Sequence, residues 1–275
     1  MNKAFGCLLF LSSVTAYGWS DQGHYLIAEI AYQNLSPRAK EQVDGLFQYL
    51  NKVDPPSDFV KSAYWADQIK NNQVQVFNRW HYIRDPIIGS SYKYTPKVYP
   101  PNVVSQSVAL AGILKSKDAS LYNKAWSLRL LIHLIGDLHQ PTHVATLYSH
   151  NFYRSDINAV KYRIRSRYKN LHRYWDLAGG LLKFRKNKTQ NRQKLLAKIM
   201  EQEKNQYHQI ASSDYKNLIS SWQKQAYLVA KDIVYTQPYG KKISKDYRHK
   251  VQKAASKQLY LAGKDLAQLL NVIYP

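Results

Sequence analysis

The chain contains a single cysteine, Cys7, so no disulfide bond can form within it. Cysteine-ligated zinc fingers and iron–sulfur clusters are excluded as well, because each needs several thiolates. Acidic residues are scarce: 18 Asp and Glu stand against 40 Lys and Arg in 275 residues, which gives a formal charge of +22. With 11 Gly and 10 Pro the chain is not collagen-like, and 45% hydrophobic residues exclude a disordered protein.

Long apolar runs are missing too, except for a short one at the N-terminus. Residues 1–18 combine a basic start, an apolar run over residues 4–11, and small residues at Ala16 and Gly18. This pattern is typical of a secretory signal peptide cleaved after Gly18, and the run is shorter than the about 20 residues that span a bilayer. We therefore expect an exported chain of residues 19–275, periplasmic or extracellular, without cysteine and without stable membrane insertion.

The excess of positive charge indicates the kind of partner. Loss of Lys3 with the signal segment would lower the charge of +22 by only one. Such a charge attracts phosphate polymers or anionic membrane surfaces over the Debye length. Solubility alone would be served equally well by acidic residues, so a polyanionic partner is the preferred interpretation.

Apolar residues at i, i+3 and i+4 dominate the chain and predict a mainly α fold. The predicted helical segments are residues 26–50, interrupted by a helix-start signal at Ser36-Pro37, and residues 103–114, 124–138, 193–219, 222–235 and 247–273. Prolines at 55–56, 86 and 100–101 indicate loops, and Pro141 is expected to end the helix before it. Without a repeat or a linker, the sequence predicts one multihelical domain over residues 19–275.

Residues 161–169 break the helical pattern. Lys or Arg holds every odd position, and Tyr, Ile or Ser holds every even position. Alternation with period two predicts a β-strand or one arm of a small β-hairpin, with all the basic side chains on one face. Arg163, Arg165 and Arg167 are therefore candidate contacts for the phosphates of a substrate.

Histidine and aspartate recur at spacings that suit a metal ion. His133 and Asp137 lie i, i+4 on a predicted helix, His172 and Asp176 repeat that spacing, and His143 follows just past Pro141. One such pair alone is better interpreted as a surface pair. Here the pairs are repeated, and His133 lies in an apolar run where an ionisable group without a partner is costly. Imidazole and carboxylate suit Zn²⁺, so the residues favour a multinuclear metal site.

Short motifs in a fixed order resemble the zinc-dependent S1/P1 nuclease family, which is related to bacterial zinc phospholipase C. The motifs are Trp19-Ser20-Asp21-Gln22-Gly23-His24, Trp65-Ala66-Asp67, His81-Tyr82, the run from His133 to His143, Asn170-Leu171-His172-Arg173-Tyr174-Trp175-Asp176, and Leu261-Ala262-Gly263. The resemblance extends from Trp19 almost to the C-terminus, and it implies the multihelical phospholipase C/P1 nuclease fold.

The resemblance also implies three Zn²⁺ per chain. One zinc would be held by Asp67, His81, His133 and Asp137, a second by His143, His172 and Asp176, and a third by His24, Asp137 and the free amine and carbonyl of Trp19. Asp137 would then bridge two ions. Trp19 could ligate through its amine only after cleavage behind Gly18.

The activity that the resemblance implies is hydrolysis of single-stranded DNA and RNA to 5′-phosphate products by a metal-activated water. We expect the protein to act as a monomer. Action on 3′-nucleotides is an additional expectation. Asp67, Asp137 and Lys70 are the predicted catalytic residues, with Lys70 beside the scissile phosphate. Asn158 is a candidate for base binding, although the family's Gly-Gly-Asn reads Asp156-Ile157-Asn158 here.

Two alternatives stay open on the sequence. A zinc phospholipase C shares the scaffold, but those enzymes end the ligand set with His-x₃-Glu, where this chain has Asp176. A non-enzymatic basic protein that binds nucleic acid would be favoured by a missing ligand, and every expected position is filled. His139 is expected to be structural, and three further histidines are expected at the surface: His150, His208 and His249.

Overall fold

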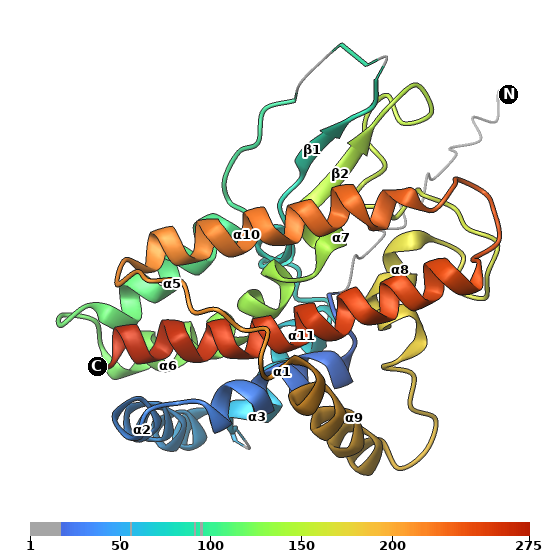
Figure 1. Ribbon diagram of the computed structural model, residues 1–275. Helices are drawn as coiled ribbons and strands as arrows, with labels where there is room; N and C mark the ends of the chain where they lie inside the picture. The colour runs from blue at the N-terminus through green and yellow to red at the C-terminus, as the bar shows by residue number, and fades with distance from the viewer. Residues whose placement is uncertain (1–17, 56, 91, 94–95) are drawn as a thin grey trace, which may run out of the picture.

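The computed structural model describes residues 18–275 except 56, 91, 94 and 95, so most of the predicted signal peptide lies outside the described residues. Helices form the body of the molecule, and a two-stranded sheet projects from it (Figure 1). The elements are α1 (Asp21–Gln33), α2 (Pro37–Val53), α3 (Phe59–Ser62), α4 (Trp65–Asn71), η1 (Asn78–His81), β1 (Asp85–Ile88), α5 (Val103–Lys115), α6 (Leu121–Leu138), α7 (Pro141–Val144), β2 (Ala145–Tyr148), α8 (Leu171–Asp176), η2 (Ala178–Gly180), α9 (Lys188–Glu203), α10 (Tyr215–Asp232), η3 (Val234–Thr236) and α11 (Lys245–Ile273).

The mainly α prediction is confirmed, and several helix starts follow from their capping residues. Ser36 accepts a hydrogen bond from the Ala39 backbone N–H, and Pro37 occupies the first position of α2. Asn102 begins α5 with a reciprocal capping box with Ser105. These side chains satisfy backbone donors that the first helical turn leaves without partners.

The predicted helix over residues 193–219 is wrong as a single helix. The structure has α9 and α10, joined by residues 204–214. The connecting segment is held by α11 instead of by helical hydrogen bonds. Tyr207 OH donates to Asp265 Oδ1 at 3.1 Å, and Gln268 Nε2 donates to Ile210 O at 2.7 Å. Tertiary contacts thus override the apolar spacing.

The prolines and the strands also depart from expectation. Pro141 begins α7 after α6 has ended at Leu138, and Pro86 lies inside β1. The expected hairpin is not the sheet that forms among the described residues: β1 and β2 pair in parallel, with Asp85 opposite Ala145. Parallel pairing joins segments that are far apart in sequence, whereas a hairpin joins neighbours.

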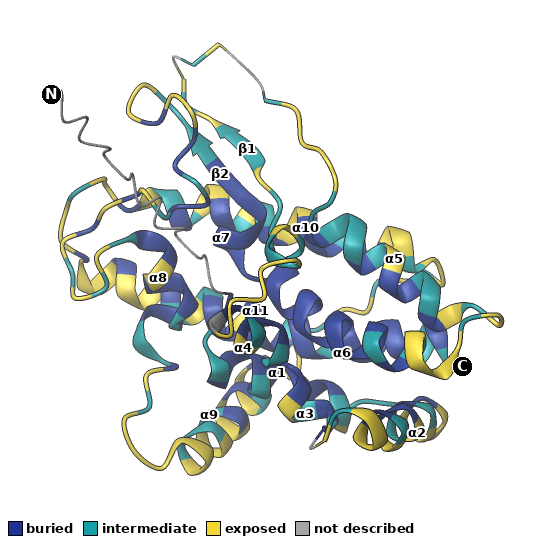
Figure 2. Ribbon diagram, turned by 180° about the vertical axis from the view of Figure 1, so that it is seen from behind, coloured by how far each residue is buried: buried dark blue, intermediate teal, exposed yellow. Residues whose placement is uncertain are grey.

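α6 is the central helix of the larger hydrophobic core. Its residues from Ser127 to Leu138 are all buried, and Figure 2 shows the helix dark blue over much of its length. Leu128, Leu131 and Leu134 pack with side chains of α2, α5 and α10. A helix covered on all sides holds polar side chains in a fixed, dry environment.

α1 and α11 approach each other closely at Gly263. A Cβ there would lie 2.5 Å from Ile30 Cβ and 2.9 Å from Ile27 O, so only glycine allows this packing. α1 carries His24, and its position therefore depends on this contact. In the described part of the chain, no helix is long and apolar enough to cross a bilayer.

Candidate metal centre

Two side chains of α6 form the centre of the site. His133 and Asp137 are fully buried, and their i, i+4 spacing places His133 Nε2 3.0 Å from Asp137 Oδ2. His133 Nδ1 lies 2.7 Å from Ala63 O. Because a carbonyl only accepts, Nδ1 carries the hydrogen and Nε2 faces the centre. Although burial opposes it, the carboxylates of Asp137 and Asp67 raise the pKa of His133.

α4 and η1 add a second pair of ligand atoms beside the first. His81 Nδ1 lies 2.9 Å from Asp137 Oδ2, 3.0 Å from His133 Nε2 and 3.6 Å from Asp67 Oδ1. Asp67 and His81 are both fully buried. Segments around residues 67, 81 and 133 therefore meet within reach of one ion.

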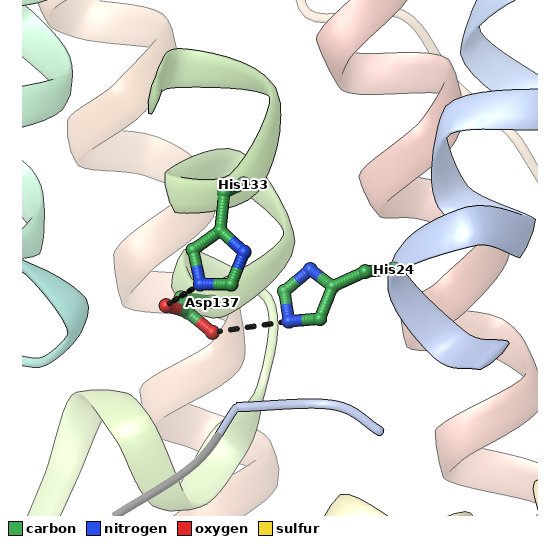
Figure 3. A group of neighbouring side chains, drawn as sticks. All are labelled: His24, His133 and Asp137. Atoms are coloured by element: carbon green, nitrogen blue, oxygen red, sulfur yellow. Dashed lines mark ion pairs between the residues drawn. The ribbon is translucent and has the colours of Figure 1, made fainter. Parts of the chain in front are cut away.

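His24 of α1 approaches the other oxygen of Asp137. Figure 3 shows His24 and His133 directed at different oxygens of the same carboxylate, with His24 Nε2 3.6 Å from Asp137 Oδ1. The two imidazole rings stack with centroids 4.1 Å apart. Asp137 thus has one oxygen facing each of two groups of ligands, which is the geometry of a bridging carboxylate.

His143, His172 and Asp176 form a third group, on α7 and α8. His172 Nε2 lies 3.5 Å from Asp176 Oδ1. Backbone carbonyls fix both rings: His143 Nδ1 donates to His81 O at 2.7 Å, and His172 Nδ1 donates to Asn158 O at 2.5 Å. Each ring therefore turns its Nε2 to the site.

Three sets of side chains thus meet the distance requirement for metal binding, with all ligand atoms of a set within 4.8 Å of one another. They are His24, His133 and Asp137; Asp67, His81 and His133; and His143, His172 and Asp176. All eight of the predicted side-chain ligands are present in these sets. Their assignment to particular ions stays a prediction.

Trp19, the ninth predicted ligand, is held against the same helices. Its indole is fully buried, and Nε1 donates to Gly136 O at 3.1 Å. The next residue, Ser20, donates its backbone N–H to Asp176 O at 2.9 Å. The Trp19 side chain is therefore bound to α6 and the backbone that follows it to α8, and both helices carry ligand residues.

Gly18 lies directly against the cluster. A Cβ on Gly18 would lie 1.8 Å from Asp137 Oδ1 and 3.0 Å from His24 Nε2. The backbone at residues 18 and 19 thus reaches the space between these two side chains. In the uncut chain the nitrogen of Trp19 is an amide, so ligation by a free amine requires the predicted cleavage.

The donor set fits a metal cation, because buried polar atoms of the centre have no other partner. Within the described residues, His24 Nδ1 and Nε2, Asp67 Oδ2, His81 Nε2 and Asp137 Oδ1 are buried without a hydrogen bond. Such atoms are costly unless an ion or water satisfies them. Imidazole nitrogen and carboxylate oxygen are the ligands expected for Zn²⁺ in the absence of cysteine.

Burial sets the protonation of His24 and His81. It lowers the pKa of His24 to about 3 and the pKa of His81 to about 4, so both rings are neutral at neutral pH. Although burial opposes it, His133 and Lys70 hold the pKa of Asp67 at about 2. Neutral imidazoles and an ionised carboxylate are the forms that bind metal.

Asp176 differs from the other carboxylates of the centre. Burial raises its pKa well above the ordinary value, with His143 and Arg173 opposing the shift. Gln140 Nε2 donates to Asp176 Oδ1 at 2.8 Å, and Arg173 lies 3.7 Å from Oδ2. Gln140 and Arg173 support a ligand and were not selected from the sequence, although both lie inside the quoted motifs.

Lys70, a predicted catalytic residue, lies beside the ligand set and is paired with Asp67. Its side chain is 4% exposed, and Nζ donates to Asp67 Oδ1 at 2.7 Å. The ammonium group is therefore fixed at the edge of the ligand set by its i, i+3 partner. This placement agrees with the predicted catalytic role, which no contact with a substrate tests.

Asn158 supports the site with its whole side chain. It is 2% exposed, its Nδ2 donates to Ile83 O at 3.1 Å and Ala145 O at 3.0 Å, and its Oδ1 accepts from Arg84 Nε at 3.2 Å. Its φ of 53° is left-handed. The carboxamide links the segments that follow His81 and His143, and base binding by Asn158 remains untested.

The basic segment 161–169 alternates in exposure as predicted, but it forms no regular strand. Odd positions are exposed, and Tyr162 and Ile164 are buried. Arg163 and Arg165 form only isolated bridges, with Asn170 and with Lys242. The chain turns back beyond residue 165, so an even row of cations along one strand is wrong.

The remaining histidines lie as the sequence indicated. His139 Nδ1 donates to Ile135 O at 2.8 Å, and its Nε2 lies 2.9 Å from Asp265 Oδ2, which is a structural role. The other three are exposed, namely His150, His208 and His249.

Comparison with known proteins shows what the whole chain is similar to. A family model described as S1/P1 Nuclease matches residues 19–275. Endonuclease 1 of Arabidopsis thaliana is 24% identical, over 98% of this chain and 91% of its own length. Endonuclease 2 of the same plant is 25% identical, over 61% of this chain and 58% of its own length. Among solved structures, the alpha toxin from Clostridium absonum matches with a TM-score of 0.45 and 16% identity, over 94% of this chain and 66% of the toxin.

Proposed function

The chain belongs to the S1/P1 nuclease family and is a phosphodiester hydrolase, and on this premise we propose that it is a three-zinc endonuclease of single-stranded DNA and RNA. Its products would carry 5′-phosphates, and it would also act on 3′-nucleotides. The observation that supports the proposal most is the presence of three buried His/Asp sets, with buried polar atoms that have no other partner in the described part of the chain.

We assign the ions as the motifs suggest. The three ligand sets would be Asp67, His81, His133 and Asp137; His143, His172 and Asp176; and His24, Asp137 and Trp19. Bound zinc would lower the pKa of a water molecule towards 7 and stabilise the charge of the transition state. Asp67 and Asp137 would hold the metal ions, and the ammonium group of Lys70, which is paired with Asp67, would orient the scissile phosphate.

The basic segment 161–169 would bind the part of the substrate that extends away from the metal centre. Arg165 lies beside residues 241–242, since its N–H donates to Lys241 O at 2.9 Å. Arg167 and Lys183 both lie over the ring of Tyr168, at 4.8 Å and 5.8 Å. Cations from several segments thus gather beside α8, where they would neutralise the phosphates of an extended strand.

Export is part of the proposal. Ligation by the amine of Trp19 requires removal of residues 1–18, which signal cleavage would supply. The mature protein would then act as a monomer in the periplasm or outside the cell. N-terminal sequencing of the protein purified from cells should give Trp19 as the first residue.

One assay separates the candidate functions. The mature protein is incubated with single-stranded DNA, RNA, duplex DNA and phosphatidylcholine, with and without chelator. We expect cleavage of both single strands to 5′-phosphate ends, slower cleavage of the duplex, no lipid turnover, and no activity with chelator. Turnover of phosphatidylcholine would favour a phospholipase C, and binding of DNA without cleavage would favour a non-enzymatic protein.

A further inference from the structure

A groove between α10 and α11 is lined by none of the proposed zinc ligands. The two helices run in opposite directions along the same side of the molecule (Figure 1). The groove between them has a volume of ≈ 530 Å³. That volume lies within the range of about 300–1,000 Å³ typical of sites for small organic ligands.

One wall of the groove is apolar and open to solvent. It is formed by Leu228 and Val229 of α10 and by Ile233 just beyond its end, and Ala254 and Leu261 of α11 extend it. Leu228 is 52% exposed, although it is a large apolar side chain. A contiguous apolar surface with an exposed leucine would be stabilised by covering it with a hydrocarbon chain.

The α11 side of the groove is cationic. Lys250, Lys253 and Lys257 follow each other at i, i+3 and i+7, and all three are exposed. In the part of the chain that the structure describes, none of them has an ion pair, and no acidic residue lines the groove. A phosphate group would be attracted to these ammonium groups, whose charges are not neutralised by the protein.

Gln258 also lines the groove, and its side chain carries a buried polar atom without a partner. Its side chain is 3% exposed, and its Oε1 has no hydrogen-bond partner among the described residues. It is next to Lys257 on α11. A buried amide oxygen without a donor is costly, so a ligand that donates a hydrogen bond here would gain affinity.

We propose that the groove binds a lysophospholipid, a single-chain lipid with a phosphate and a free hydroxyl group. The acyl chain would cover Leu228 and its apolar neighbours, the phosphate would lie at the three lysines, and the glycerol hydroxyl would donate to Gln258 Oε1. A polynucleotide has phosphates but offers no hydrocarbon chain to the apolar wall.

Calorimetric titration of the zinc-loaded mature protein with lauroyl lysophosphatidate, below its micelle concentration, tests the proposal. We expect one site. Dodecyl phosphate, which lacks the hydroxyl, should bind about threefold to tenfold more weakly, and uncharged dodecyl maltoside should be weaker still. Absence of binding, or equal binding of all three amphiphiles, would overturn the proposal.

Variants locate the site independently of nuclease activity. Leu228→Glu, at an exposed position that should not affect folding, should weaken lysophosphatidate binding about tenfold or more. Gln258→Leu should abolish the preference over dodecyl phosphate. Lys231→Gln removes an exposed lysine of α10 outside the groove and should leave the Kd within about twofold. Wild-type affinity in Leu228→Glu, or an equal loss in Lys231→Gln, would refute the assignment.

Discussion

Asp137 lies close to four histidines of the centre, with two of them at each carboxylate oxygen. Its Oδ2 lies 3.0 Å from His133 and 2.9 Å from His81, and its Oδ1 lies 3.6 Å from His24 and 3.5 Å from His143. Loss of its charge therefore affects several ligands at once. Asp176 belongs to a single candidate set, with His143 and His172.

Asp137→Asn should consequently be more damaging than Asp176→Asn. We expect the first change to remove about two zinc ions per chain and to lower kcat/KM well beyond the about 10–100-fold loss typical of residues that only support a ligand. The second should remove about one ion. Elemental analysis and single-strand cleavage measure both effects, and equal loss of one zinc in the two variants would exclude a bridging role for Asp137.

Trp19 should need its free amine. The close approach of Gly18 to Asp137 and His24 leaves little space for any residue that precedes Trp19. A protein with one additional Met before Trp19 should therefore retain about two zinc ions and little activity, compared with the protein that starts at Trp19. Three zincs and a normal rate in the extended protein would show that the amine is not a ligand.

The residue spacing predicted two pairs of neighbouring candidate ligands, but it did not predict the residues that support them. The i, i+4 pairs around His133 and His172 are local, so helix geometry alone places the two members together. The supporting role of Asn158 could not be predicted from helix spacing. Its support of Arg84 and His172 depends on a left-handed backbone and on chain segments that only the fold brings together.

At the scale of elements, local patterns succeeded and long-range pairings failed. The apolar spacing of α5, α6 and α11 predicted each helix, because each buries one face or more in the core. Paired residues of β1 and β2 lie 60 positions apart in sequence, in a register that short-range patterns do not contain. Residues 161–169 alternate in burial because Tyr162 and Ile164 pack into a hydrophobic cluster, although the segment forms only isolated bridges.

The basic segment 161–169 yields a prediction at the scale of elements. Replacement of Arg163, Arg165 and Arg167 with Gln should weaken binding of long single strands and lower the salt slope by up to about 2 units, since each phosphate contact contributes about 0.7. Hydrolysis of a mononucleotide should be spared, because it does not extend to the loop. Binding of oligonucleotides from low to high salt measures the slope, and an unchanged slope with full zinc content would place the contacts elsewhere.

At the scale of the whole molecule, metal should stabilise the fold as well as the reaction. The ligands come from α1, α4, η1, α6, α7 and α8, and the mature chain would have no disulfide to hold these segments together. A zinc ion held at about a thousand times its Kd contributes about 4 kcal/mol. Each kcal/mol of stability lost lowers the Tm of a chain of this size by about 2–4 °C, so chelation should lower the Tm by about 10 °C or more. Differential scanning calorimetry measures this change. An unchanged Tm after verified zinc removal would contradict this.

The chelated protein should also become less stable in acid. Burial lowers the pKa of His24 from 6.5 to about 3 and the pKa of His81 from 6.5 to about 4. Below pH 6.5 the unfolded chain therefore binds protons that the folded chain does not bind, so stability falls as the pH falls towards 4. His24→Gln and His81→Gln should flatten the dependence of Tm on pH in this range, and an equally steep dependence in the double variant would contradict the assignment.

The central claim is that catalysis depends on three zinc ions held by this one cluster. The most direct test is to titrate the chelated mature protein with zinc while measuring both bound zinc and cleavage of single-stranded DNA. We predict that activity is absent without metal and reaches its plateau at three zinc ions per chain. Full activity in protein shown to be free of metal, or a plateau at one ion, would contradict the account.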